Sequence, residues 1–298
     1  MANPKILITG VCGFAGRALS AELARNGYTV HGLDSASPGV QLPEGCSSFH
    51  RVDISRAFPQ EGYFDFVFHL AAYNVTHVGD RSPEKYREVN VLGTEHVLSG
   101  VSSSHFVLLS TVKVYRNEGK PLAEDSPLEP QGEYEKSKLA AENLCRATLA
   151  NGNLCVLRCV NIMGPGQAVK AVVPVLFDRA ARGEPLEIFA PKESFLQFLS
   201  IRDLVSCCLE IVRKEGISGT FNAASPGRIR LDELAFAIRD ICGSSSEVRF
   251  TGPQAEPFSE VLCENLGRAL GWSPRMTIHE MLEDYYRACY PDGHPPKP

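Results

Sequence analysis

The stretch KILITGVCGFAG, residues 5–16, decides how this chain folds. It opens with the apolar strand pattern Lys5-Ile6-Leu7-Ile8, and a glycine-rich turn follows at once. Beyond the turn, Ala18, Leu19 and Leu23 stand at the spacing of a helix face. A strand that passes through such a turn into a helix presents backbone N–H groups and a helix N-terminus, which bind a pyrophosphate.

Three glycines give the turn its expected roles. Gly10 permits the tight turn, Gly13 lets the backbone approach the phosphates, and Gly16 lets the helix pack close to the strand. The spacing is GxxGxxG rather than GxGxxG. Because three glycines can also make a simple turn, the motif needs support from elsewhere in the chain.

Asp34 gives that support at the end of a second strand pattern, residues 28–33. An acid about 20 residues beyond the glycines can accept hydrogen bonds from both hydroxyls of the adenine ribose, and it repels a 2′-phosphate. Asp34 therefore favours NAD over NADP, although an acid in this place can also cap a turn. Asp53 follows a third pattern, residues 49–52, where it can meet the adenine or serve as a turn residue.

Composition excludes several classes of protein. The 298 residues carry a net charge of −5 with no basic run, which argues against nucleic acid as a partner. No apolar stretch approaches the ~18 residues of a membrane span, and the chain begins with a core strand rather than a signal peptide. Its ten cysteines are scattered without metal-binding spacing. We therefore expect no metal site, free thiols and a cytoplasmic location.

Strand and helix patterns alternate through the first half of the chain. Further strands are predicted at residues 65–70, 105–109 and 153–158, and helices at 84–98 and 132–149. Repeated βα units predict an α/β fold, a doubly wound parallel sheet with helices on both faces. Ligands bind beyond the carboxyl ends of such strands. The residues predicted at these ends are Ala71, Ser110, Thr111 and Asn161.

The chemistry rests on Tyr134 and Lys138 in the sequence YEKSK. Residues four apart on a helix face the same way, and an ammonium group near a phenol favours the phenolate. We therefore expect Lys138 to lower the Tyr134 pKa from about 10, so that the phenol exchanges a proton with a substrate hydroxyl. A hydroxyl at Ser110 or Thr111 can hold the substrate oxygen.

These motifs resemble the extended short-chain dehydrogenase/reductase family, in its NAD-dependent epimerase/dehydratase branch. TGVCGFAG (9–16) resembles its cofactor loop, HLAA (69–72) its fourth strand, and LSTVKVY (109–115) its strand with the catalytic hydroxyl. YEKSK (134–138) matches its Tyr/Lys pair, and LRCVN (157–161) the segment whose Asn contacts substrate. The resemblance covers nearly the whole chain.

The resemblance implies a Rossmann domain over residues 1–161 plus about 195–224, and a smaller substrate domain over 162–194 and 225–298. It implies NAD as cofactor, a nucleotide-diphosphate sugar as substrate, and a homodimer formed through the helices at 84–98 and 132–149. The implied catalytic residues are Thr111, Tyr134 and Lys138. The implied cofactor-binding residues are Gly10, Gly13, Phe14, Ala15, Gly16, Asp34, Asp53, Ile54, Leu70, Ala71, Ala72, Asn90, Ser110, Tyr134 and Lys138. The implied substrate-binding residues are Tyr73, Thr111, Lys113 and Asn161.

Two departures from the family pattern narrow the reaction. Dehydratases of this branch follow the catalytic Thr with Asp-Glu, but Val112 and Lys113 stand here and supply no carboxylate. Lys113 also argues against the decarboxylating members, which tend to place Glu there. Many sugar-nucleotide members carry an arginine near Leu196 that grips a phosphate. The candidates to replace it are Arg179, Arg182, Arg228 and Arg230.

The sequence thus favours an NAD-dependent epimerase that acts on a nucleotide-diphosphate sugar through a transient keto intermediate. One alternative is an NAD(P)-dependent reductase or dehydrogenase of a keto-sugar or another alcohol. Another is a catalytically silent NAD-binding regulator, which the intact set of Thr111, Tyr134 and Lys138 argues against. The sequence names neither the sugar nor the nucleotide nor the reacting carbon.

Overall fold

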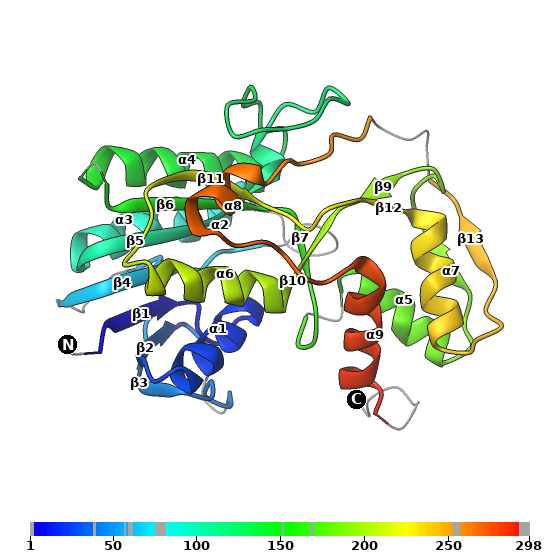
Figure 1. Ribbon diagram of the computed structural model, residues 1–298, viewed down its shortest axis with the longest axis horizontal. Coiled ribbons are helices and arrows are strands. Elements are labelled where there is room, and N and C mark those ends of the chain that lie inside the picture. Colours follow the sequence, from blue (N-terminus) through cyan, green and yellow to red (C-terminus); the bar gives the residue numbers. More distant parts are fainter. Residues whose placement is uncertain are drawn as a thin grey trace.

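A seven-stranded parallel sheet forms the larger part of the molecule (Figure 1). The computed structural model describes residues 3–37, 40–56, 58, 62–74, 82–150, 152–167, 170–252 and 257–291. The sheet has the order β11-β6-β5-β4-β1-β2-β3. Its strands are β1 (Lys5–Thr9), β2 (Thr29–Asp34), β3 (Cys46–Arg51), β4 (Tyr63–His69), β5 (Ser102–Thr111), β6 (Leu154–Cys159) and β11 (Gly219–Ala223). The order reverses at β1, between β2 and β4, as in a doubly wound sheet.

Helices cover both faces of this sheet, and the alternation of side chains along each strand explains why (Figure 1). On β1, Ile6 and Ile8 join one buried cluster and Leu7 joins another. Successive strand residues point to opposite faces, so both faces of this strand are apolar and both need a cover. One face packs against α1 (Phe14–Arg25), α6 (Ile201–Arg213) and α8 (Glu264–Leu270). The other packs against α3 (Gly93–Gly100) and α4 (Glu133–Thr148).

The predicted helix at 84–98 contains an irregular turn that the pattern did not predict. The structure has α2 (Pro83–Tyr86), then a π-helical segment η1 (Arg87–Leu92), then α3. Wider turns of this kind are rare and occur often at functional sites. The helix predicted at 132–149 is confirmed as α4, with Gly132 and Leu149 as its caps.

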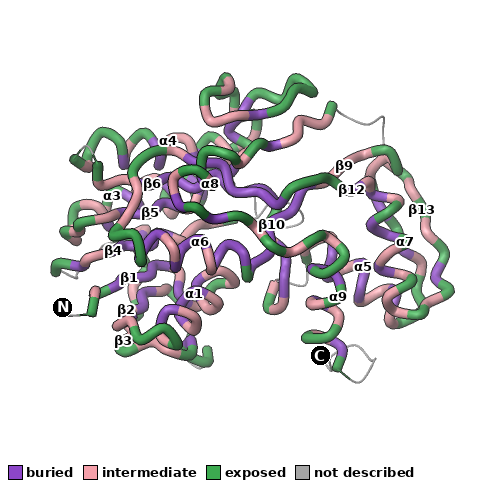
Figure 2. Tube along the Cα trace, in the orientation of Figure 1, coloured by how far each residue is buried: buried purple, intermediate pink, exposed green. Residues whose placement is uncertain are grey.

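A smaller unit lies beyond the carboxyl ends of the strands (Figure 1). Its elements are β7 (Asn161–Met163), α5 (Val172–Ala181), β8 (Leu186–Ile188), β9 (Phe195–Leu196), β10 (Phe198–Ser200), β12 (Ile229–Arg230), α7 (Leu231–Ile241), β13 (Val248–Phe250) and α9 (Ile278–Cys289). Residues of α5, α7 and α9 share a buried cluster of their own, visible in Figure 2 as purple stretches away from the sheet.

The chain returns to the first unit at more places than the single return that the sequence predicts. Val261, Leu266, Leu270 and Trp272 pack into the cluster beside the large sheet. We therefore propose that the chain visits the first unit again at residues 261–272, within the stretch 225–298 that the sequence division assigns to the second. The division as a whole stays a prediction. Residues 292–298 lie outside the described residues.

All ten cysteines are free thiols, as predicted. Burial raises the pKa of Cys155, Cys159, Cys207 and Cys208, which keeps these thiols protonated and unreactive. Among the described residues, no helix is both long and apolar enough to cross a membrane. Within the same residues, no group of three or more His, Cys, Asp or Glu side chains gathers where it could hold a metal ion.

A buried carboxylate on α4 ties the helix to the sheet. Glu142 is 0% exposed and accepts two hydrogen bonds from the Arg158 guanidinium of β6, at 3.0 and 2.7 Å. It also accepts from the Ser110 hydroxyl at 2.5 Å and from Arg146 at 2.8 Å. Burial opposes the negative charge, but the hydrogen bonds from Arg158, Ser110 and Arg146 hold the Glu142 pKa below its usual value.

This buried pair gives a stability prediction. Arg158→Met leaves the Glu142 charge buried without its bidentate partner, and we expect a loss of about 3–5 kcal/mol in the free energy of unfolding. Arg179→Met is the matched control, because Arg179 pairs with Glu187 at the surface, and it should cost less than about 1 kcal/mol. Urea denaturation measures both. Equal losses in the two variants would contradict a structural role for the Glu142–Arg158 pair.

Candidate active site

The glycine turn between β1 and α1 has the geometry that its glycines allow. Gly10 has φ +73°, a left-handed conformation, and a Cβ on it would lie 2.7 Å from the Ala71 nitrogen. A Cβ on Gly16 would meet Val11 Cα at 2.6 Å. Helix α1 begins at Phe14 with Gly13 as its N-cap. Since the first N–H groups of a helix lack intrahelical acceptors, they are open to an anion.

A cavity of about 430 Å³ opens beside this turn. Most of the predicted cofactor residues line it. The lining includes Gly10, Gly13, Asp34, Asp53, Ile54, Leu70, Ala71 and Ala72, together with Cys12, Leu33, Ser35, Ala36, Val40, Val52 and Val89. Three strand ends and the glycine turn thus form one apolar recess with two carboxylates, a composition that suits an adenosine group.

Asp34 is held in place by backbone N–H groups. One carboxylate oxygen accepts from the Cys12 N–H at 2.9 Å and the other from the Ala36 N–H at 2.9 Å. The second bond is the turn cap that the sequence left open as an alternative. The two roles are compatible, because each carboxylate oxygen has a further lone pair for a ribose hydroxyl.

Asp53 takes the role of a turn residue in the structure. Its Oδ1 accepts from the Ser55 N–H at 3.0 Å and from the Ser55 hydroxyl at 2.7 Å. It nevertheless lines the cavity, so the contact with adenine stays a prediction.

A buried histidine supports the floor of the cavity. His69 Nδ1 and Thr9 Oγ1 are 2.7 Å apart, and His69 Nε2 lies 2.9 Å from Thr94 Oγ1. Thr9 Oγ1 in turn accepts from the Ala71 N–H at 3.3 Å. Burial, and then the Lys138 charge, lower the His69 pKa to about 3, so the ring is neutral. In the sequence His69 is visible only as the first residue of the HLAA motif, which predicts no role for its ring.

The three predicted catalytic residues come from β5 and from α4, which pack together. Thr111 is the last residue of β5, and its Oγ1 accepts from the Lys113 N–H at 3.2 Å. The short 3₁₀ helix η2 (Val112–Val114) that follows packs against α4. Tyr134 and Lys138 lie one turn apart on α4, and Lys138 is 4% exposed.

The direction predicted for the Tyr134 pKa is wrong for the chain without its cofactor. Burial raises the pKa of the phenol, and the neighbouring Glu135, Cys159 and Tyr86 act in the same direction. Lys138 is not among the groups that shift the Tyr134 pKa in the chain without cofactor. Burial lowers the Lys138 pKa to about 8, against opposite effects of Glu142, Cys145 and Cys159. The sequence pattern shows the spacing of the pair but not its desolvation.

The Ser110 hydroxyl is committed elsewhere, since it donates to Glu142. Of the two hydroxyls that the sequence offered for the substrate oxygen, Thr111 keeps its proton available, because it accepts from the Lys113 N–H and meets no acceptor among the described residues. Lys113 is exposed at the start of the loop after β5. Asn161 is exposed as well, and its amide donates to the Gln197 carbonyl at 3.4 Å.

Asn90 organises the site from the π-helical segment. Its amide oxygen accepts from the Tyr73 N–H at 2.7 Å, and its amide nitrogen donates to the Tyr73 carbonyl and to Ser137 Oγ at 2.8 Å. Ser137 donates to the Tyr134 carbonyl. Rings of Tyr73, Tyr86 and Tyr134 form a chain, with centroids 5.2 and 6.1 Å apart. Asn90 thus joins Tyr73 to the catalytic helix, and its direct contact with cofactor stays a prediction.

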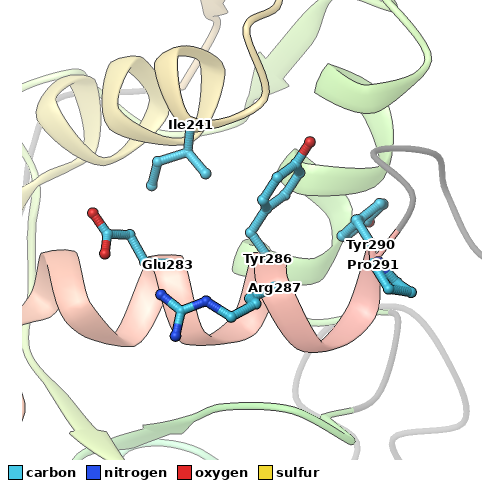
Figure 3. A pocket seen from close by; sticks show the side chains of 6 residues that line it. All are labelled: Ile241, Glu283, Tyr286, Arg287, Tyr290 and Pro291. Atoms are coloured by element: carbon cyan, nitrogen blue, oxygen red, sulfur yellow. The ribbon is translucent and has the colours of Figure 1, made fainter.

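A second cavity lies in the smaller unit, away from every predicted site residue (Figure 3). It measures about 330 Å³ and is lined by Ile241, Glu283, Tyr286, Arg287, Tyr290 and Pro291. The sticks in Figure 3 show Ile241 above the residues of α9. Tyr286 and Tyr290 stack on each other with centroids 5.3 Å apart, which makes this region part of the packing of the small unit.

The raised pKa of Tyr134 can be tested by optical titration. Because burial opposes a negative charge on Tyr134, we expect its phenol to stay protonated beyond about pH 10 in the cofactor-free protein. The difference in phenolate absorbance between the unaltered protein and Tyr134→Phe measures this. A phenolate signal from Tyr134 with a midpoint below about pH 9 would contradict the role of burial.

Comparison with known proteins shows which family and which solved structures this chain is similar to. A family model described as the NAD dependent epimerase/dehydratase family matches residues 6–224. UDP-glucuronic acid decarboxylase 1 of Xenopus tropicalis is 26% identical over 93% of this chain and 70% of its own length. UDP-glucose 4-epimerase of Streptomyces lividans is 25% identical over 97% of this chain and 98% of its own. The solved structure of MoeE5 with UDP-glucuronic acid and NAD has a TM-score of 0.85 and 23% identity, over 95% of this chain and 98% of that one.

The family match covers the glycine turn, Asp34, Thr111, Tyr134, Lys138 and Asn161 in a single stretch. It agrees with the parallel sheet and with the cavity beside the turn, and NAD is the cofactor of the family that it describes. This chain belongs to the NAD-dependent epimerase/dehydratase family, enzymes of the extended short-chain dehydrogenase/reductase type.

Proposed function

We propose that this enzyme is an NAD-dependent epimerase of a nucleotide-diphosphate sugar, with a UDP-sugar as the first candidate. One observation carries the proposal: Tyr134 and Lys138 stand one turn apart on α4 against the Thr111 end of β5, while η2 supplies Val112 and Lys113 but no carboxylate. Proton transfer at a hydroxyl is thus provided for, and elimination of water is not. The similarity to proteins named as UDP-sugar epimerases and decarboxylases supports the substrate class.

The residues present fit NAD. The Gly10 and Gly16 positions leave no room for a Cβ, and Asp34 is fixed at the cavity with lone pairs for ribose hydroxyls. When bound, NAD supplies a hydride acceptor with a positively charged ring. The chain's own contribution is the glycine turn and the helix α1 N-terminus for the pyrophosphate, and Asp34 for the adenine ribose.

Tyr134 holds and moves the proton. Its raised pKa keeps the phenol protonated in the free enzyme, so the base forms only where positive charge offsets the desolvation. Lys138 supplies one such charge below its pKa of about 8, and we expect it also to bind the nicotinamide ribose. Thr111 Oγ1 orients the reacting sugar hydroxyl, and Tyr134 takes its proton and later returns it.

The competing reactions place different demands on the residues of the site and on the release of the cofactor. A decarboxylase is the strongest rival among the relatives, and Lys113 in place of an acid argues against it. A reductase must release its cofactor after each turnover, whereas an epimerase regenerates it. The homodimer through the helices at 84–98 and 132–149 and the cytoplasmic location stay predictions.

The proton relay is tested by Tyr134→Phe. The variant keeps the ring but loses the acid–base group, and we expect kcat to fall by about 10²–10⁴ while substrate binding is largely kept. Tyr63→Phe is the matched control, because Tyr63 is 55% exposed at the outer end of β4. Turnover of UDP-glucose and UDP-glucuronic acid is followed by separation of the products. Near-normal turnover by Tyr134→Phe would refute the assignment.

The same assay separates the reactions. An epimerase returns the hydride that it took, so a 4-epimer should form with no net change in NADH absorbance. Stoichiometric formation or consumption of NADH would favour the dehydrogenase or reductase. A 4-keto-6-deoxy sugar would overturn the argument from Val112 and Lys113, and a UDP-pentose with release of CO₂ would overturn the argument from Lys113 against decarboxylation.

Asp34 should set the preference between cofactors. Its carboxylate accepts ribose hydroxyls and repels a 2′-phosphate, so we expect NAD to bind at least about tenfold more tightly than NADP. Asp34→Asn removes the charge and should reduce this preference by about tenfold. Asp125→Ala, which changes an exposed acid outside the cavity, is the control. Fluorescence titration with each cofactor measures the effect, and an unchanged preference in Asp34→Asn would leave Asp34 as a turn residue only.

A further inference from the structure

Arg228 stands out among the four arginines considered as partners for an anion. Arg179 pairs with Glu187 at 3.0 Å, Arg182 with Asp178 at 3.0 Å, and Arg230 with Asp232 at 2.7 Å. Arg228 is exposed, and within the described part of the chain it has neither an ion pair nor a hydrogen bond from its guanidinium. Its positive charge is therefore available to a ligand.

Two aromatic rings hold Arg228 in place. Its guanidinium carbon lies 4.4 Å from the ring centroid of Phe195 and 5.7 Å from that of Phe258. The two rings are themselves neighbours, with centroids 5.6 Å apart. A guanidinium over aromatic faces loses freedom before a ligand arrives, yet its N–H edge stays open for a bidentate anion.

The first ring is connected to the substrate side of the site. Phe195 and Leu196 form β9, which pairs with β12 so that Ile229 faces Leu196 and Arg230 faces Phe195. Arg228 directly precedes β12, and Gln197 directly follows β9. The Gln197 carbonyl accepts from the amide of Asn161, a predicted substrate residue. Figure 1 shows β9 and β12 side by side in the small unit, above β10 in this view.

The second ring is connected to the catalytic strand. Phe258 is flanked by Pro257, whose carbonyl accepts from Asn117 at 2.7 Å, and by Ser259, which donates to Asn117 at 2.7 Å. The Ser259 hydroxyl also accepts from the Gly119 N–H at 3.0 Å. Asn117 and Gly119 belong to the loop that starts at Thr111 and carries Lys113. Both rings are thus anchored to segments that carry predicted substrate residues.

We propose that Arg228 binds the diphosphate of the sugar nucleotide, in a chain whose position 196 is leucine. This inference rests on the proposed function for its substrate class. A planar guanidinium with an open edge matches two phosphate oxygens, and charge-assisted bidentate bonds are the strong ones. Asn161 and Thr111 then meet the sugar of the same molecule, while Arg228 holds the diphosphate that links the sugar to the nucleoside.

The test uses the full-length enzyme loaded with NAD, with UDP as the probe. We expect Arg228→Gln to weaken UDP binding by about 10- to 100-fold in calorimetric titration, and Arg228→Lys to fall between that variant and the unaltered enzyme. Arg182→Gln is the matched control, since it removes an exposed arginine of the same unit that already has a carboxylate partner. It should bind UDP normally. Because Arg228 is exposed, all variants should keep the thermal midpoint and NAD affinity of the unaltered enzyme.

The outcomes separate this inference from the proposed function. Unchanged UDP affinity in Arg228→Gln would overturn the inference. A defect seen with UDP-glucuronic acid but absent with UDP and UDP-glucose would overturn it too, because Arg228 would then bind a sugar carboxylate. If the unaltered enzyme binds NAD but neither UDP nor dTDP, the sugar-nucleotide class itself fails, and the inference fails with it.

Discussion

The carboxylate of Glu142 is the constraint on which the catalytic side of this molecule depends. It is buried on α4 and can stay charged only because donors from two strands and its own helix surround it. Those donors fix the rotation and the height of α4 over the ends of β5 and β6. Arg158 extends the link outward, since its guanidinium lies 4.8 Å from the Tyr115 ring, and Tyr115 donates to Asn222 of β11.

The same burial shapes the proton chemistry. Lys138 lies one turn before Glu142 on α4. Its ammonium group is buried, and the Glu142 carboxylate acts on it. Its pKa falls to about 8, and the Tyr134 pKa rises. Before the cofactor binds, the Tyr134 phenol is therefore neutral, and the Lys138 ammonium group loses its proton more readily than an exposed lysine does. Because interactions in a low-dielectric site are strong, a positive charge placed next to the phenol lowers its pKa more here than it would in water.

The sequence predicted the parts of the fold that local chemistry determines. The turn at Gly10, the Asp34 strand end and the helix with Tyr134 follow from spacing and strand or helix period, and they lie where expected. The π-helical segment around Asn90 could not be predicted from local sequence, because the Asn90 side chain bonds to Tyr73 and Ser137, which lie outside that segment. The prediction for the Tyr134 pKa was wrong for a related reason. The spacing of Tyr134 and Lys138 shows that the two residues are neighbours, but it does not show that burial removes the water around them.

The two units carry different parts of the proposed machinery and differ in how much change they tolerate. The proposed cofactor and proton groups lie on the parallel sheet and on α4, where Glu142 and the glycine turn tolerate little change. The cation that we propose for substrate recognition is exposed after β11 and is held, among the described residues, by two ring contacts. Leu196, on the paired strand, is only partly buried. A change of the recognising side chain at either position therefore disturbs fewer buried groups than a change at Glu142 or Gly10.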